Sequence, residues 1–345
     1  MPSSNTQVLP FPIMIADIGG TNARFSILVD AHAEPKIFEN IKASDYPDLN
    51  SAIQKHVLDR TSLIPQTAVL AVAGPVEGDT IDLTNNNWVV EPLKMISDLG
   101  FDEVVVLNDY EAQALAAVAL EPDQLEQIGD SEQDSEANRV VLGPGTGLGV
   151  AGLVHAAGRW IPVAGEGGHV DLGPQTERDL EVFPHIQRIE GRVSGEQVLC
   201  GRGVVNLYRA VCAADGVKPA FDDPAQITEA AIDATDARAE ETVALFCEYL
   251  GRVAGDLALI FMAHGGVYLT GGITKKILPV FDRDRFRKAF ANKAPHTDLV
   301  EKMPTFAVIN DRAPMKGLAA FARTPMRFGV SLNGRRWKRE TEPAN

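Results

Sequence analysis

Two polar residues, Asn108 and Asp109, stand between a buried apolar run and a helix-forming segment, and they are the first candidates for chemistry. The run Val104–Leu107 predicts a strand buried on both faces. Residues 110–120 are rich in Ala, Leu, Glu and Gln, which favours a helix. Open α/β sheets bind ligands at the carboxyl ends of such strands. Asp109 is therefore either a catalytic carboxylate or part of a helix cap, because Asn108 and Glu111 have the spacing of a capping box.

Glycine-rich turns with a threonine hydroxyl occur twice, at residues 19–22 and 145–149. Backbone N–H groups in such turns can converge on phosphate oxygens, because no Cβ blocks the approach. One such turn alone is weak support for a phosphate site, since hairpins use glycine in any case. A third glycine pair follows the strand-like run 267–270 and suits an adenine ring or a neighbouring phosphate. The candidate phosphate and nucleotide contacts are Gly19, Gly20, Thr21, Asn22, Gly145, Thr146, Gly147, Gly271 and Gly272.

Asp17 directly precedes the first of these turns, so it would lie beside a bound phosphate. A carboxylate at that place is unfavourable unless a cation intervenes. The sequence therefore predicts Mg²⁺ held mainly by the phosphates, with Asp17 contributing through water. The alternative is that Asp17 only caps the turn.

Glu166, His169 and Glu196 form a third group of polar candidates. They could bind a metal or accept hydrogen bonds from hydroxyl groups. Zinc would need Cys or His companions, and no CxxC pair or second nearby His supplies them. Carboxylates that accept bonds from neighbouring hydroxyls, with the amide of Asn108 added, fit a sugar. A plain surface loop is the alternative for His169.

The elements that must position these residues are two strand–turn–strand hairpins. Residues 20–29 (GTNARFSILV) and 145–154 (GTGLGVAGLV) both begin with Gly-Thr and end with Leu-Val. A strand, not a helix, follows each turn, so this is not the context of a Rossmann glycine motif. The two hairpins predict a duplicated α/β domain, with chance similarity as the alternative. The acidic residues 121–138 are expected to be a solvated connection near a domain boundary.

Composition excludes several classes of function. The 345 residues are 45% apolar and 23% charged, which is ordinary for a globular protein, and length allows two domains. A formal net charge of −15 argues against a general nucleic-acid surface. The three cysteines are far apart and indicate a reducing compartment. Without a signal peptide or an apolar run of membrane-spanning length, we expect a cytoplasmic protein with no membrane partner.

Six motifs together resemble the bacterial glucokinase family, within the superfamily of hexokinases, actin and sugar kinases. They occur in order between Ile13 and Ala322, and their combination is highly specific. The motifs are IADIGGTNARFSI, LNDYEAQALA, GPGTGLGVAGL, GEGGHVDL, VSGEQVLCGRGVVNLYRA and YLTGGI. The basic residues after Arg323 depart from the family core and are expected to form a solvated tail.

The resemblance implies two actin-like, ribonuclease-H-like α/β domains that flank a central cleft. The small domain would be residues 1–110, completed by a returning helix at about 314–323. The large domain would be residues 111–313, and residues 324–345 would be the basic tail. The implied activity is ATP-dependent phosphorylation of glucose at its 6-hydroxyl, with Mg²⁺, which feeds glycolysis. A homodimer is implied by the family alone.

Residue roles follow from the matched motifs. The resemblance makes Asp109 the catalytic base and places Asn108, Asp109, Glu166, His169 and Glu196 around glucose. The glycine turns become ATP contacts, and residues 84–88 are similar to a polar loop on the sugar side.

Two rival functions remain at this point. A kinase of the ROK family (repressor, open reading frame, kinase) acting on another hexose would carry a cysteine-rich zinc motif, which is absent here. A non-catalytic, sugar-sensing regulator would be expected to carry a helix-turn-helix for DNA.

Overall fold

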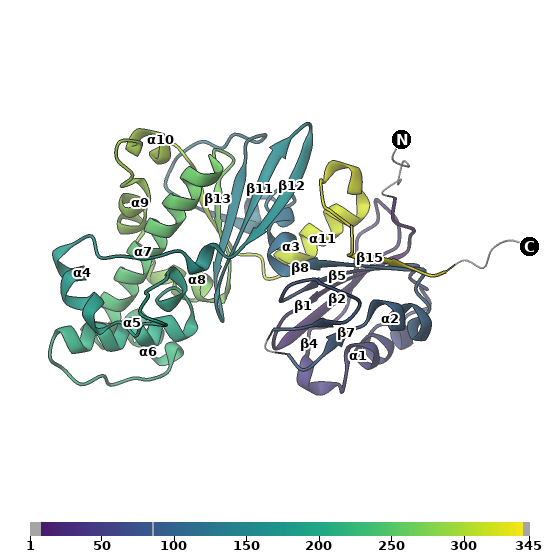
Figure 1. Cartoon of the computed structure of the whole chain (residues 1–345), viewed down its shortest axis with the longest axis horizontal. Coiled ribbons are helices and arrows are strands. Elements are labelled where there is room, and N and C mark those ends of the chain that lie inside the picture. The colour runs from purple at the N-terminus through teal and green to yellow at the C-terminus, as the bar shows by residue number, and fades with distance from the viewer. Residues whose placement is uncertain (1–7, 85, 341–345) are drawn as a thin grey trace, which may run out of the picture. The chain divides into compact units, whose positions relative to one another are not determined.

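The computed structural model describes residues 8–84 and 86–340, which divide into two compact units (Figure 1). The first, called unit 1, comprises Met1–Leu120, His155–Ala164 and Asp311–Asn345. The second, unit 2, comprises Glu121–Val154 and Gly165–Asn310.

Unit 1 is built on a seven-stranded sheet in the order β15-β8-β5-β1-β2-β3, with β4 also paired to β2. Strands β1, β5 and β8 run parallel and are buried almost throughout, as their apolar runs predict. Strand β2 returns antiparallel to β1 as the predicted hairpin. The strands of unit 1 are β1 (Ile13–Ile18), β2 (Asn22–Leu28), β3 (Lys36–Ile37), β4 (Ile41–Lys42), β5 (Thr67–Val72), β6 (Ile81–Asp82), β7 (Val89–Val90), β8 (Glu103–Asn108) and β15 (Arg336–Lys338).

Helices cover both faces of this sheet. Its helices are α1 (Leu49–His56), α2 (Pro92–Leu99), α3 (Asp109–Ala116) and α11 (Ala313–Arg323). Helices α3 and α11 pack against each other on one face, and α1 and α2 lie on the other (Figure 1). The approach of α11 to α3 requires glycine at 317, because a Cβ there would lie 2.1 Å from the carbonyl oxygen of Ala112. This packing fixes α3, the helix that begins at Asp109.

The strands of unit 2 repeat the arrangement in a six-stranded sheet in the order β12-β11-β10-β13-β14-β9, of which β12 belongs, except for Gly165, to the residues of unit 1. Strand β11 is antiparallel to β10, two parallel strands follow, and the edge strand β9 is antiparallel. Unit 1 has the same sequence of pairings from β2 through β1, β5 and β8 to β15. The predicted fold class of two similar α/β domains is confirmed. The strands are β9 (Leu125–Ile128), β10 (Arg139–Pro144), β11 (Leu148–Ala156), β12 (Arg159–Gly165), β13 (Val267–Leu269) and β14 (Thr305–Val308).

The core of unit 2 forms between its sheet and a group of helices dominated by α7. Helix α7 begins after Asp236, whose carboxylate accepts hydrogen bonds from two backbone N–H groups of the first turn. The helices of unit 2 are α4 (Glu177–Val182), α5 (Gly201–Ala214), α6 (Pro224–Ile232), α7 (Ala237–Phe261), α8 (Gly272–Ile277), α9 (Arg283–Ala291) and α10 (Thr297–Glu301).

Three expectations differ from the structure. Residues 121–138 are not wholly a solvated connection, because they contain the edge strand β9, whose Ile128 is buried. The division between the units falls after Leu120 and not after Tyr110, since α3 packs within unit 1. The basic tail after Arg323 returns as β15 at the edge of the first sheet, where Trp337 is buried.

None of the helices within residues 8–84 and 86–340 combines the length and apolar character that a membrane span needs.

Candidate active site

The loop between β8 and α3 separates the two roles that the sequence left open for Asn108 and Asp109. Asn108 is the N-cap of α3, because its side-chain oxygen accepts a hydrogen bond from the N–H of Tyr110 at 2.9 Å. Glu111 closes the predicted capping box by accepting from the N–H of Asn108 at 3.0 Å. The amide nitrogen of Asn108 donates to the carbonyl of Gly74 at 3.1 Å. Asp109 is the first residue of the helix, so the fold does not need its carboxylate as the cap.

The pKa of Asp109 lies well above the ordinary value of an aspartate. Burial raises the pKa of Asp109 to about 7, and repulsion from the nearby carboxylate of Asp17 adds to the rise. The hydrogen bond from Tyr110 N–H opposes it. Burial also raises the pKa of Asp17, although the guanidinium of Arg24, 2.9 Å away, favours the charged form. A carboxyl group that titrates near neutral pH can accept a proton during catalysis.

The first glycine turn follows Asp17 and joins β1 to β2. It is closed by a hydrogen bond from the N–H of Gly19 to the carbonyl of Asn22 at 3.0 Å. The side chain of Asn86 donates to the carbonyl of Gly19 at 3.0 Å, which ties the polar loop 84–88 to this turn. Asn85 of that loop lies outside the described residues. Gly20 and Thr21 are at the surface of unit 1, where the turn can receive an anion.

In unit 2 the structure brings Glu166, His169 and Glu196 together. The Nε2 atom of His169 lies 3.9 Å from a carboxylate oxygen of Glu166 and 3.7 Å from Oε2 of Glu196. Glu166 is 91% exposed and His169 53% exposed, whereas Glu196 is only 13% exposed. Two outward-facing groups beside one ordered carboxylate can surround a polyhydroxylated ring.

The second glycine turn lies against the same carboxylate. Oε2 of Glu196 accepts from the N–H of Leu148 at 3.0 Å, and a Cβ at Gly147 would lie 2.6 Å from that oxygen. The turn is closed by a bond from Gly145 N–H to the Gly147 carbonyl at 2.8 Å. Because Gly147 has no side chain, the carboxylate of Glu196 can lie directly against the turn. Thr146 lies between Gly145 and Gly147 in this turn.

Gly271 and Gly272, which follow β13, are the remaining candidate nucleotide contacts in unit 2. Gly271 has a φ of +84°, and a Cβ there would lie 2.2 Å from the carbonyl oxygen of Pro144. Pro144 precedes the second turn, so the glycine pair packs against the strand end that carries it. The hydroxyls of Thr270 and Thr274 are buried and make no hydrogen bond within the part of the chain that the structure describes.

Two arginines that pair with the candidate site residues were not predicted from the sequence. Arg24 is the cross-strand partner of Asp17 in the β1–β2 hairpin, so the register of that hairpin could have revealed it. Arg202, in the first turn of α5, pairs with Oε1 of Glu196. No local pattern indicates this second pair, because Glu196 and Arg202 lie on either side of an irregular segment.

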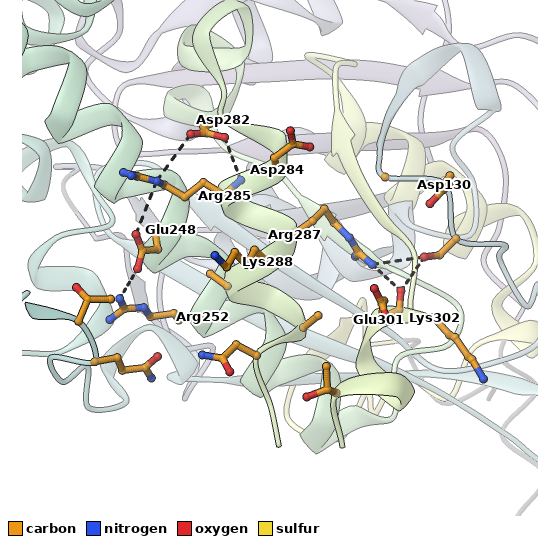
Figure 2. A pocket seen from close by; sticks show the side chains of 18 of the residues that line it. Asp130, Glu248, Arg252, Asp282, Asp284, Arg285, Arg287, Lys288, Glu301 and Lys302 are labelled. Atoms are coloured by element: carbon orange, nitrogen blue, oxygen red, sulfur yellow. Dashed lines mark hydrogen bonds and ion pairs between the residues drawn. The ribbon is translucent and has the colours of Figure 1, made fainter. Parts of the chain in front are cut away.

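A pocket of about 1570 Å³ in unit 2 is a separate feature, lined chiefly by α7, α9 and the loop after β9. Figure 2 shows that Asp282, Arg285, Glu248 and Arg252 follow one another in a row of ion pairs on one side of this pocket. Arg285 lies 3.8 Å from both Glu248 and Asp282, and Arg252 pairs with Glu248 as well. None of the predicted site residues lines this pocket. It is therefore not the candidate active site.

Within residues 8–84 and 86–340, no cluster of three or more His, Cys, Asp or Glu side chains is arranged to hold a metal ion. The three cysteines are buried free thiols.

Comparison with known proteins gives a consistent result. The model of the family described as Glucokinase matches residues 14–325. A glucokinase of Rhizobium johnstonii is 59% identical over 338 residues, which cover 98% of this chain and 99% of that protein. The crystal structure of a glucokinase from an Antarctic psychrotroph is 33% identical, with a TM-score of 0.82, and covers 91% of this chain and 100% of its own. A ROK family glucokinase from Streptomyces griseus, solved with glucose and AMPPNP, shares the fold at 22% identity and a TM-score of 0.59, covering 90% and 99% of the two chains.

Proposed function

The chain belongs to the glucokinase family and phosphorylates glucose with ATP, and we propose that Asp109 is the base of this reaction. One observation carries the assignment: Asp109 is a half-buried carboxyl with a pKa of about 7 at the carboxyl end of β8. Asn108 performs the capping, so the carboxylate of Asp109 is available to the 6-hydroxyl of the sugar. The products are glucose 6-phosphate, which enters glycolysis, and ADP.

The sugar contacts that we propose are Asn108 and Asp109 in unit 1 and Glu166, His169 and Glu196 in unit 2. Carboxylates are acceptors only, and they suit the vicinal hydroxyls of a hexose. Glu196 is held by the N–H of Leu148 and by Arg202, which supports a fixed direction for its remaining lone pairs. Hydrogen-bond acceptors that are held in place distinguish the stereochemistry of a sugar ring better than mobile ones, because less side-chain entropy is lost when the sugar binds.

The phosphates of ATP are assigned to the two glycine turns. Gly19, Gly20, Thr21 and Asn22 would contact them from unit 1, and Gly145, Thr146 and Gly147 from unit 2. The adenine side is assigned to Gly271 and Gly272, where the buried hydroxyls of Thr270 and Thr274 support a polar ligand. Backbone N–H groups offer these contacts without a side chain that must be ordered first.

Magnesium is part of the proposal. The donor set of unit 1 fits it, because Mg²⁺ is usually held by one or two carboxylates together with substrate phosphates. Asp17 lies beside the first turn, and its repulsion of Asp109 shows that two carboxylates share this region. When bound, Mg²⁺ neutralises charge on the phosphates and orients them. Asp17 would hold it through water, and Arg24 would keep Asp17 in position.

Within this scheme each protein group has a limited task. Asp109 accepts the proton of the 6-hydroxyl as the sugar oxygen forms its bond to the γ-phosphorus. The bond between that phosphorus and the β–γ bridging oxygen breaks, and ADP leaves with the electron pair. The N–H groups of the turns stabilise negative charge on the phosphoryl oxygens, which is where most of the catalytic effect in phosphoryl transfer lies.

A coupled assay of ADP release across a panel of hexoses tests the function. We expect release that depends on glucose and is far slower with fructose. Equal rates with another hexose would favour the ROK-type alternative, and binding of glucose without ADP release would favour a non-catalytic sensor. The ROK-type rival lacks the support of a cysteine-rich zinc motif, because the three cysteines are separate, buried free thiols.

A cytoplasmic location and a homodimer complete the proposal. The buried free thiols support a reducing compartment. The net charge of −15 supports the absence of nucleic-acid partners. Size-exclusion chromatography with light scattering measures the oligomeric state directly.

A further inference from the structure

The C-terminal segment after residue 325 lies outside the region that the glucokinase family model matches. It nevertheless enters the sheet of unit 1, where β15 pairs antiparallel with β8. The carbonyl of Arg335 accepts from the N–H of Val106 at 3.0 Å, which extends the pairing beyond the strand itself. Trp337 is buried and donates to Asp79 at 2.6 Å. This segment therefore docks beside the strand that ends at Asn108.

Arg335 reaches from this segment to the capping box of α3. Its Nη1 lies 2.8 Å from Oε1 and 2.7 Å from Oε2 of Glu111. Glu111 is a buried residue, 5% exposed, and its Oε2 also accepts from the N–H of Asn108. A chain of charge-assisted hydrogen bonds thus runs from Arg335 through Glu111 to the backbone immediately before Asp109.

We propose that Arg335 is a positioning residue that fixes Asn108 and Asp109 through the carboxylate of Glu111. The proposal rests on the assignment of Asp109 as the base. Without Arg335, Glu111 is a buried carboxylate without its charge partner, which is strongly unfavourable. It turns toward water, and the N–H of Asn108 loses its acceptor. The first turn of α3 then no longer holds Asp109 in one direction.

Arg336, the next residue, supplies a matched control. Its guanidinium donates to the buried carboxylate of Glu103 at 2.9 and 2.6 Å. Glu103 begins β8, whereas Asn108 ends it. Arg335 and Arg336 therefore make similar ion pairs with buried carboxylates, Arg335 with Glu111 of α3 and Arg336 with Glu103 of β8, but only the pair of Arg335 includes the capping box.

The test compares Arg335→Met and Arg336→Met in the full chain by steady-state kinetics and thermal unfolding. Both variants should melt at a lower temperature than the wild type. We expect Arg335→Met to lower kcat about 10-fold, because small misplacements of a reacting group have effects of that order or more. Its KM for ATP and the kcat of Arg336→Met should stay within about two-fold of wild type. Arg335→Lys keeps a charge and one donor direction and should recover most of the lost turnover.

The double variant Glu111→Ala/Arg335→Met shows whether Arg335 acts through Glu111. Its kcat should be no lower than that of Arg335→Met, because both changes break one chain of contacts. If Arg335→Met cannot be purified in folded form, the double variant replaces it, since it leaves no unpaired carboxylate. Its kcat should then be about 10-fold below wild type.

Equal kcat values for Arg335→Met and Arg336→Met would overturn the proposal, and so would a double variant within about two-fold of wild type. Asp109→Asn, assayed in parallel, separates this failure from that of the proposed base. Normal turnover in Asp109→Asn refutes the base. Loss of turnover in Asp109→Asn with normal turnover in Arg335→Met refutes only the positioning role.

Discussion

Replacing Asp109 by asparagine should lower the catalytic rate and at the same time raise the stability of the folded protein. The substitution keeps the size of the side chain and an acceptor for the N–H of Tyr110, which Asp109 bonds at 3.0 Å. It removes the charge that accepts the proton. General-base catalysis contributes about 10²–10⁴-fold, so kcat should fall by that order. Direct binding of glucose should weaken much less, because an amide still forms hydrogen bonds.

The same substitution should stabilise the folded protein at neutral and alkaline pH. An aspartate has a pKa of about 4 in the unfolded chain, and Asp109 has one of about 7 in the folded chain. Folding therefore favours the protonated form, and this contribution to stability is complete below about pH 4 and is lost as pH rises through 7. Three pKa units correspond to at most about 4 kcal/mol. Because Asp109 is partly exposed, we expect a gain of roughly 2–4 kcal/mol near pH 8.

Thermal unfolding at several pH values measures this effect alongside the kinetics. The gain in melting temperature of Asp109→Asn should be large near pH 8 and small near pH 4. Asp48→Asn is the matched control, since Asp48 is the N-cap of α1 and accepts from Ser51 N–H at 2.7 Å. It should leave kcat unchanged and show no such gain, because asparagine caps about as well as aspartate. A variant at 109 that retained more than about a tenth of wild-type turnover would refute the catalytic assignment.

Three further predictions concern the pH profile, the metal and the second turn. The rate of the wild type should rise with pH through about 7, as the carboxyl of Asp109 ionises, and a rate that stays flat from pH 5 to 8 would contradict the assigned base. Removal of Mg²⁺ by chelation should abolish ADP release and addition of Mg²⁺ should restore it, and full activity without metal would contradict the role given to Asp17. Gly147→Ala should raise the KM for glucose about 10-fold by displacing Glu196, because the new Cβ would lie 2.6 Å from its Oε2. Gly173→Ala, which has open space, should leave KM unchanged.

Local patterns in the sequence determined a large part of the protein. The glycine turns, the buried strands that precede Asp17 and Asn108, and the capping box of Asn108 and Glu111 each depend on residues a few positions apart. Hydrophobic run length and turn chemistry act over that range, so they can be interpreted without knowledge of the fold. The repeated hairpin also predicted the duplicated α/β class, because both copies preserve the same turn and strand pattern.

Tertiary structure decided the partners and the environment of those residues. The sequence left Asp109 between cap and catalyst, and only burial and the neighbouring charge of Asp17 gave it a pKa near 7. Glu196 and His169 are 27 positions apart, yet the fold places them side by side. The basic tail was expected to be solvated. Composition cannot show that Arg335 of this tail pairs with the buried carboxylate of Glu111, 224 positions away in the sequence. A charged side chain carries no local signal for a distant partner, since the free energy of its pairing depends on burial that only the folded chain creates.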